Sequence, residues 1–516
     1  MKGYLIFVGL ILISFLYLIS GCGAEMPIEP AKFNEMLKYD PKRILNVIED
    51  SKLRVYIFDL IIASRPDSTL SGKTIEYISK KDFEKITSLN LSGKNIAGLK
   101  GLELCRNLSS LYLTSVKIND LSPLSGMKEL KYLDISECNV NNLNPLSSIT
   151  SIESLTANNN NISDITALAG LQNLRQLDLS QNKIKDISAL ENLKNLERLS
   201  LWNNQIKDIS PLKNCVNLKY LYLWNNAVED ISPITNLAKL INVSIHVNKI
   251  KVLPDLTNML QLNYFAANNN EITSIGKIEN LENLQYLYLD YNMLTQITTI
   301  SNLPELRQLG LASNGITKIE GLKNVGNISF LILPDNKISD ISFLEETPNV
   351  TMLYLSRNNI SDVTPLNYLV QPEYFGLSDN KIKDLGFLVN FTTLKNLDIG
   401  YNNLTNIDIL APLTNLETFQ IQNNNISDIS VIKNFKKLNH FDAEYNRISN
   451  IDAFRELPNL NTLELSGNNI SDLSAIIDCP GMRVNSFLSL NLNPLSDKAK
   501  NEQIPLLKER GVYIIY

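Results

Sequence analysis

The 516-residue chain has few of the side chains from which catalytic and metal centres are usually built. It contains two histidines, two tryptophans and five cysteines, and it has no zinc-protease helix, P-loop or serine-elbow motif. Its net charge is −6, whereas binding to nucleic acid requires concentrated Lys and Arg. These shortages predict that the chain is not an enzyme, holds no cofactor and binds no nucleic acid.

Long apolar runs are also scarce, and residues 3–20 form the one run long enough to cross a membrane. Lys2 precedes this run, and Ile19-Ser-Gly-Cys22 ends it in a way that resembles the lipobox of bacterial lipoproteins. The resemblance implies a signal peptide over residues 1–21 and lipidation of Cys22. Attachment to the extracytoplasmic face of a bacterial membrane would then be through this lipid only. An uncleaved signal anchor and ordinary secretion are the alternatives.

Most of the chain consists of a repeat of 22 residues. Fifteen asparagines follow one another at this interval from Asn160 to Asn468, and the same spacing extends backwards to Cys138, Val116 and Lys94. Around each position the residues read L-x-L-x-x-N-x-I, which is the consensus of leucine-rich repeats. The 18 units predict a curved α/β solenoid over residues 87–484. We expect a parallel β-sheet on its concave face and 3₁₀ or irregular turns on its convex face.

The columns of the repeat have structural explanations. The column asparagine offers two donors and an acceptor to backbone groups at an interior corner. An Asp four residues later, followed by Ile-Ser-Pro-Leu or a variant, predicts capped 3₁₀ turns. The repeats at Val252, Ser274, Gln296 and Lys318 lack this Asp, which predicts a locally altered convex side.

Four cysteines follow Cys22. Cys105, Cys215 and Cys479 occupy a column that other repeats fill with Leu or Phe, and Cys138 replaces a column asparagine. Cys105 and Cys215 are five repeats apart, which at one strand spacing per repeat is roughly 24 Å and too far for a disulfide. We expect all four side chains to fill the core without forming disulfides.

Both ends of a solenoid must be closed, because a terminal repeat exposes its core. Residues 22–86 predict a short tether and a helical N-terminal cap, with helix-like apolar spacing at Ala31–Asp40 and Pro41–Leu60. Residues 485–516 predict a C-terminal cap with the final repeat. Its helical stretch opens at Asn493-Pro-Leu-Ser and stops at Gly511, before a last strand.

Two segments resemble those of internalin-type bacterial leucine-rich repeat proteins. One is the convex segment Ile-x-Asp-Ile-Ser-Pro-Leu of each repeat, and the other is the segment from Ile78 to Leu91 that joins the N-terminal cap to the first repeat. The resemblance spans roughly residues 74–495 and implies a surface module that binds other macromolecules, in some members host receptors. No immunoglobulin-like segment follows the repeats in this sequence, and the anchor resembles a lipid rather than a cell-wall linkage. The protein partner is therefore expected either in a host or in the cell's own envelope.

The outward strand positions predict an acidic concave face. Only two basic residues, Arg198 and Arg357, fall on these positions and no lysine does, although an even spread of the chain's 48 Lys and Arg would place about seven there. The ten acidic residues are Asp134, Glu137, Asp178, Asp290, Asp335, Asp379, Asp398, Asp442, Glu444 and Glu464. A ligand with a basic or mixed surface is the expected partner.

Aromatic side chains gather on the same face, including both tryptophans of the chain. The candidate ligand-binding residues are Arg198, Trp202, Tyr220, Tyr222, Trp224, His246, Tyr264, Tyr286, Tyr288, Asp290 and Tyr291. Contiguous aromatic surface usually marks an interaction site, although stacking that only stabilises the sheet is the alternative explanation.

The kind of ligand is left open between a protein and a glycan or envelope polymer, since sugar rings also pack on aromatic faces. An arc of roughly 85 Å favours a protein. His246 and His440 lie nine repeat steps apart, roughly 40 Å, and cannot share a catalytic site. Asp442 and Glu444 are neighbours that could imitate a hydrolase pair, but they flank an open sheet without a pocket. The acidic columns could also bind a metal, but surface carboxylates are usually only solvated.

Overall fold

The computed structural model describes residues 47–64 and 80–516. The predicted signal peptide, Cys22 and the predicted helix at Ala31–Asp40 lie outside the described residues. Within them, no helix is both long enough and apolar enough to cross a membrane.

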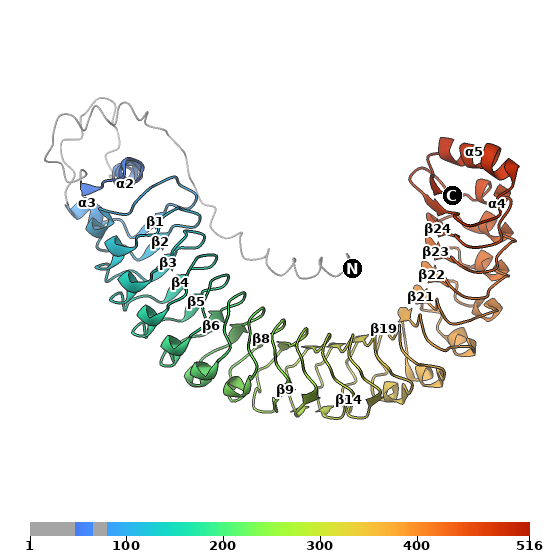
Figure 1. Cartoon of the computed structure of the whole chain (residues 1–516), viewed down its shortest axis with the longest axis horizontal. Coiled ribbons are helices and arrows are strands. Elements are labelled where there is room, and N and C mark those ends of the chain that lie inside the picture. The colour runs from blue at the N-terminus through green and yellow to red at the C-terminus, as the bar shows by residue number, and fades with distance from the viewer. Residues whose placement is uncertain (1–46, 65–79) are drawn as a thin grey trace.

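The described chain forms a curved solenoid, which confirms the predicted fold class (Figure 1). Its concave face is a 20-stranded sheet in which neighbouring repeats pair in parallel. The register is constant, because Arg198 pairs with Tyr220 and Tyr264 with Tyr286, one repeat away each time. The strands are β1 (Ser88–Asn90), β2 (Ser110–Tyr112), β3 (Tyr132–Asp134), β4 (Ser154–Thr156), β5 (Gln176–Asp178), β6 (Arg198–Ser200), β7 (Tyr220–Tyr222), β8 (Asn242–Ser244), β10 (Tyr264–Ala266), β13 (Tyr286–Tyr288), β16 (Gln308–Gly310), β18 (Phe330–Ile332), β19 (Met352–Tyr354), β20 (Tyr374–Gly376), β21 (Asn396–Asp398), β22 (Thr418–Gln420), β23 (His440–Asp442), β24 (Thr462–Glu464), β25 (Phe487–Ser489) and β26 (Tyr513–Ile515).

The convex side carries 3₁₀ helices in most repeats, as predicted. In ten repeats the recurrent Asp accepts a hydrogen bond from the backbone N–H two residues later, for example Asp186 from Ser188 at 2.7 Å. This is an Asx-turn at the start of the 3₁₀ helix, one residue before its N-cap. The helices are η2 (Leu102–Leu104), η3 (Ser122–Leu124), η4 (Asn144–Leu146), η5 (Thr166–Leu168), η6 (Ser188–Leu190), η7 (Ser210–Asn214), η8 (Ser232–Ile234), η9 (Ser342–Glu346), η10 (Thr364–Tyr368), η11 (Gly386–Asn390), η12 (Asp408–Leu410), η13 (Ser430–Asn434) and η14 (Asp452–Glu456).

The four repeats at Val252, Ser274, Gln296 and Lys318, which lack this Asp, differ on the convex side, which confirms the second expectation. Short parallel strands replace the 3₁₀ helices there and pair from one repeat to the next as β9–β11, β12–β15 and β14–β17. Their bounds are β9 (Val252–Leu253), β11 (Ser274–Ile275), β12 (Ile278–Glu279), β14 (Gln296–Ile297), β15 (Ile300–Ser301) and β17 (Lys318–Ile319).

The column asparagines satisfy the interior backbone as predicted. The Oδ1 atom of Asn182 accepts a hydrogen bond from the backbone N–H of Ile162, at 2.9 Å. Its Nδ2 atom donates to the carbonyl groups of Ala157 and Leu179, both at 3.0 Å. The same pattern recurs through the array to Asn493, which lies 25 residues after Asn468 instead of 22.

The cysteines are core residues. Cys105, Cys138, Cys215 and Cys479 are buried free thiols, as their columns predict. Cys138 replaces an asparagine, and its Sγ atom lies 3.0 Å from the carbonyl oxygen of Leu113 and 3.3 Å from that of Ser136, to which the thiol donates weakly.

The N-terminal cap contains a helix within the stretch predicted from Pro41 to Leu60. Helix α2 spans Ser51–Ala63, and residues 41–46 of the predicted stretch lie outside the described residues. Asp50 determines the start, because its Oδ1 atom accepts hydrogen bonds from the backbone N–H groups of Lys52 and Leu53. Its other oxygen accepts from the N–H of Ala97, which ties the cap to the first repeat. Helix α3 (Lys80–Glu84) then leads into β1.

The C-terminal cap follows the prediction. Helix α4 (Ser474–Ile477) replaces the last 3₁₀ turn, and the π-helical turn η15 (Ala499–Gln503) continues into α5 (Ile504–Glu509). Gly511 ends the helix with a φ of 86°, and β26 completes the sheet. Gln503 joins the cap to the solenoid, because its buried amide accepts from the N–H of Leu473 and donates to Asp472.

Candidate binding surface on the concave face

The candidate residues come from five adjacent strands, β6, β7, β8, β10 and β13, and from the turns that follow them. The leucines of each repeat point into the core, so the residues that flank them face outward. Leu199 is fully buried, for example, while Arg198 is exposed and Trp202 half-buried. The structure therefore places the whole predicted set on the concave sheet.

The two tryptophans form a stack with a histidine. The rings of Trp202 and Trp224 lie 4.4 Å apart, centroid to centroid, at an interplanar angle of 5°. His246 continues the stack at 5.3 Å from Trp224 and 8°. The rings stand side by side along the solenoid, so the inner ring faces contact each other and the ring edges face outward.

His246 is a neutral member of this stack. Burial lowers the pKa of its imidazole to about 4, and its Nδ1 atom lies 2.9 Å from the hydroxyl of Ser244. The imidazole is therefore uncharged near neutral pH, which fits a ring packed on an indole.

Arg198 lies against two tyrosines of the next strand. Its guanidinium carbon is 5.5 Å from the ring centroid of Tyr220 and 5.0 Å from that of Tyr222, within the range of cation–π attraction. Burial is the main cause that raises the pKa of Tyr222. The one arginine on this half of the face is thus held in place by aromatic neighbours.

A second aromatic group follows on β10 and β13. Tyr264 lies 6.2 Å from Tyr286 and 5.6 Å from Tyr288, with tilted rings in both pairs. Burial raises the pKa values of Tyr264 and Tyr288, so both hydroxyl groups stay protonated and can donate or accept hydrogen bonds.

Asp290 and Tyr291 lie at the end of this group but differ in exposure. Tyr291 is 56% exposed. The carboxylate of Asp290 folds over Gly310, where a Cβ atom would lie 2.4 Å from its Oδ2 atom, and it accepts a hydrogen bond from the N–H of Ala312 at 2.8 Å. Burial raises the pKa of Asp290 to about 6. A larger residue at position 310 would force this carboxylate to move.

The sequence analysis missed an extension of the same surface. Phe330, Ile332 and Met352 are half-buried at outward positions of β18 and β19, and the rings of Tyr354 and Tyr374 lie 4.5 Å apart. These residues occupy the same columns as the candidate set, so the column position alone would have identified them.

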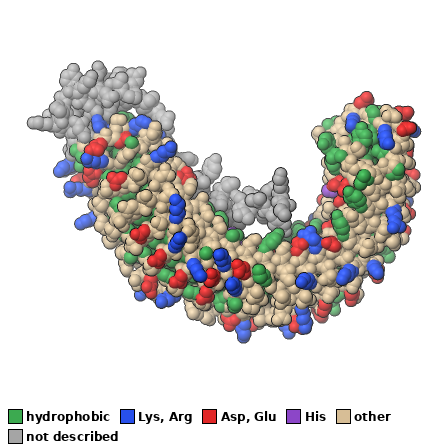
Figure 2. All heavy atoms as spheres, viewed as in Figure 1, with side chains coloured by type: hydrophobic (Ala, Val, Ile, Leu, Met, Phe, Trp, Pro, Cys, Tyr) green, Lys and Arg blue, Asp and Glu red, His purple; other side chains and the backbone are tan. Residues whose placement is uncertain are grey.

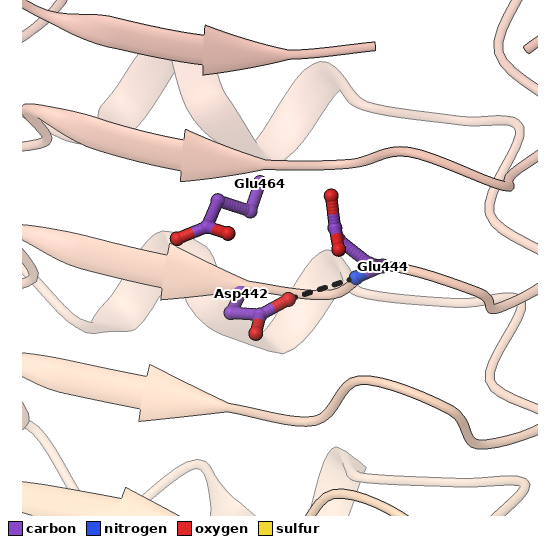
Figure 3. A group of neighbouring side chains, drawn as sticks. All are labelled: Asp442, Glu444 and Glu464. Carbon is purple, nitrogen blue, oxygen red and sulfur yellow. Dashed lines mark hydrogen bonds between the residues drawn. The ribbon is translucent and has the colours of Figure 1, made fainter. Parts of the chain in front are cut away.

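Carboxylates gather further along the face, on β23 and β24. One oxygen each of Asp442, Glu444 and Glu464 lie within 4.8 Å of one another, and Asp442 accepts a hydrogen bond from the N–H of Glu444 at 3.0 Å (Figure 3). His440 lies beside them, with its Nε2 atom 3.3 Å from Glu464. Burial, and then the neighbouring carboxylates, raise the pKa of Asp442 to about 7.

Hydrophobic side chains are visible along the inner side of the arc, while Lys and Arg lie mostly on its outer and lateral parts in this view (Figure 2). Ion pairs such as Arg175–Glu197 at 2.5 Å and Lys219–Glu197 at 2.7 Å lie at the entry to the strands. They line a lateral hollow of about 540 Å³ together with Asn195 and Lys239. The basic residues therefore neutralise the flanks of the sheet rather than its concave face.

Family models of leucine-rich repeats match parts of the chain. The model of two repeat copies matches residues 150–192, 172–214, 194–237, 282–324 and 392–434, and the model described as leucine rich repeat matches residues 414–470. A search of curated proteins finds no match.

Solved structures share the fold. A leucine-rich repeat protein of Leptospira interrogans is 21% identical, with a TM-score of 0.63, over 77% of this chain and 99% of that one. The functional domain of InlJ from Listeria monocytogenes, which includes a cysteine ladder, is 20% identical, with a TM-score of 0.60, over 79% of this chain and 82% of that one. The Arabidopsis receptor kinase HAESA, in complex with the peptide hormone IDA and the co-receptor SERK1, is 18% identical, with a TM-score of 0.59, over 90% of this chain and 85% of that one. The repeat matches and the shared solenoid show that this chain has the leucine-rich repeat fold, as do InlJ and the Leptospira protein.

Proposed function

We propose that this chain is a surface-exposed, lipid-anchored leucine-rich repeat protein that binds a protein partner on its concave face. The observation that carries the proposal is the contiguous aromatic surface of β6, β7, β8, β10 and β13, in which Trp202, Trp224 and His246 stack and Arg198 packs on two tyrosines. Trp, Tyr and Arg dominate the energetics of protein interfaces, and contiguous apolar patches on soluble proteins usually mark interaction sites.

The ring geometry favours a protein over a glycan. Sugar rings bind aromatic side chains by packing on the ring faces, and the inner faces of this stack are occupied by neighbouring rings 4.4 and 5.3 Å away. The ring edges remain, and they suit the mixed apolar and polar side chains of a polypeptide. The fold likeness to HAESA, whose structure holds a peptide hormone, supports the same choice.

The lipid anchor rests on the sequence Ile19-Ser-Gly-Cys22 alone. It would hold the solenoid at the extracytoplasmic face of a bacterial membrane, where a host protein or a protein of the cell's own envelope could reach the concave sheet. Cys22→Ala should abolish both lipid labelling and partitioning into detergent. Unchanged labelling and partitioning in this variant would contradict the anchor.

The binding proposal is tested with the partner that the full chain retrieves from envelope or host extracts. Replacing Trp202 and Trp224 together by Ala should weaken its affinity by 100-fold or more, because interface anchors contribute roughly 2 kcal/mol or more each. A matched control replaces Tyr368 and Leu260, which are 47% and 54% exposed and lie outside the concave face. The control should bind like the wild type.

A melting curve of the same variants separates binding from folding. The proposal expects the tryptophan variant to keep most of its thermal stability, since both rings lie outside the core. Full affinity in the double variant, or a loss of affinity that appears only together with a collapsed melting temperature, would mean that the stack merely supports the sheet.

A further inference from the structure

Several buried or half-buried carboxylates of the concave face form no ion pair with a cation of the described chain. Among the described residues, no ion pair reaches Asp290, Asp398 or Asp442. They accept hydrogen bonds only from neutral groups, such as the N–H of Ala312 and the hydroxyl of Ser378. Burial raises the pKa of all three. An anion in such a place gains more from an added cation than an exposed carboxylate does, because water screens it less.

Carboxylates elsewhere in the described chain show the contrast. Glu197, at the flank of the sheet, is held between Arg175 and Lys219, and these two partners lower its pKa. On the concave face itself, Arg357 pairs with Asp335 and lowers the pKa of that carboxyl. The chain thus supplies cations to its flanks and to one concave carboxylate, while the deeper concave carboxylates are left for a cation from outside.

An apolar strip joins the two carboxylate regions. Between Asp290 on the β13 side and Asp442 on β23 lie the half-buried side chains of Phe330 and Met352 and the ring pair of Tyr354 with Tyr374. Seven strand spacings separate β13 from β23, which is roughly 34 Å along the sheet. An extended polypeptide rises about 3.3 Å per residue, so roughly ten residues bridge this distance.

We infer that the partner of the concave face is an extended, cationic segment of polypeptide that crosses the strands from Asp290 to the carboxylates of Asp442, Glu444 and Glu464. This inference deepens the proposed function and rests on it. Apolar or aromatic side chains of the segment lie over β18–β20, and Lys or Arg side chains reach the carboxylates at its two ends. Asp442 is only 9% exposed, so a long, thin side chain on an extended backbone reaches it better than a rigid surface does.

The test uses a library of random twelve-residue peptides displayed on phage, panned on the purified full chain. Bound pools from the wild type are compared with those from the triple variant Asp442→Asn, Glu444→Gln, Glu464→Gln. The matched control is Glu129→Gln, Glu282→Gln, Glu502→Gln, which removes the same number of charges at exposed positions off the concave face. Melting curves accompany both variants.

The inference expects Lys and Arg to be enriched in the pool bound by the wild type and by the control, and this enrichment to disappear with the triple variant. The most enriched peptide should bind the triple variant tenfold or more weakly than the control, and its binding should weaken with salt. A wild-type pool without cationic enrichment, or enrichment that survives in the triple variant, overturns the inference.

The two proposals can fail separately. The peptide pool shows no cationic preference in one outcome, while the retrieved partner loses its affinity for the Trp202→Ala, Trp224→Ala variant. The aromatic surface then binds a protein, and only the inferred cationic segment is wrong. If the tryptophan variant binds the retrieved partner like the wild type, the proposed function itself is wrong.

Discussion

The column asparagines act where each repeat turns away from the sheet. Asn314 accepts a hydrogen bond from the N–H of Leu294 and donates to the carbonyl groups of Leu289 and Leu311. One side chain therefore connects the backbone of its own repeat with that of the repeat before it. A buried backbone group that loses such a partner costs about 1–3 kcal/mol.

The first prediction at the scale of single residues concerns this column. Asn314→Ala should lower the free energy of unfolding by about 1–3 kcal/mol, because it leaves interior backbone groups unpaired. Asn195→Ala is the control, since that exposed side chain donates one bond to the carbonyl of Gln172 at the surface. Denaturant titrations of both variants check the prediction. Equal midpoints for the wild type and Asn314→Ala would contradict the role of the column.

The second residue-scale prediction concerns pH. The folded pKa of Asp442 is raised from 3.8 to about 7, so the folded state binds a proton more tightly than the unfolded state. Stability from this group is therefore fully present below pH 4 and is lost as pH rises through about 7.

Asp442→Asn removes the ionisation and should make the variant more stable than the wild type at pH 8, by about 1–2 kcal/mol after allowance for solvent screening. The difference between variant and wild type should shrink at pH 5. Melting temperatures measured across this range check the prediction, and a difference that does not depend on pH would refute it.

At the scale of secondary-structure elements, the convex side takes two forms. Most repeats with the recurrent Asp form 3₁₀ helices that follow an Asx-turn, whereas the four middle repeats without it form paired strands. On the convex side, the paired strands bring the backbones of neighbouring repeats as close together as in the concave sheet. At Gly321 this close approach of two backbones requires a glycine. A Cβ atom on Gly321 would lie 2.2 Å from the carbonyl carbon of Thr298.

Gly321→Ala should therefore destabilise the solenoid by about 1–3 kcal/mol, because backbone must move to admit the methyl group. Gly326→Ala is the matched control, since its Cβ would meet nothing within 4 Å and its φ is not in the left-handed region. Hydrogen exchange of the backbone from residue 296 to residue 323 measures the effect locally. Equal exchange in the two variants would show that the close approach is not needed.

Sequence and structure agree best where the repeat determines the position of a side chain. A strand alternates its side chains between two faces, so the columns of Leu177 and Trp202 could be assigned to core and concave surface from spacing alone. Val252 stands where other repeats have Asp, which indicated an altered convex turn. The sequence did not indicate that this segment forms a strand. That outcome depends on contacts between repeats, such as the one at Gly321.

Other features depend on tertiary detail that spacing does not contain. The alignment of Trp202 on Trp224 within 5° depends on side-chain torsions, and the burial of Asp442 depends on the side chains around it. Helix α2 begins at Ser51 because Asp50 caps it, and the apolar periodicity before that point gave no sign of this. Phe330 and Tyr354 were missed because the aromatic cluster was defined by its densest repeats.

At the scale of the whole molecule, the solenoid is an open arc with its sheet on the inner side (Figure 1). Each repeat adds one strand and one set of outward positions, so a surface property can extend over many repeats without disturbing the core. In this chain the aromatic surface lies on β6, β7, β8, β10 and β13 with an extension on β18, β19 and β20, and the clustered carboxylates lie on β23 and β24. A ligand that contacts both regions must follow the curve of the sheet.

The most direct test of binding on the concave face uses the fact that Trp202 and Trp224 are the only tryptophans of the chain. Full chain labelled with 5-fluorotryptophan should give two ¹⁹F resonances, which Trp202→Phe and Trp224→Phe assign. Addition of the retrieved partner should shift both resonances and reduce their solvent exposure, because the ligand covers the ring edges. Two resonances that stay unchanged at saturating partner would show that the partner binds elsewhere on the molecule.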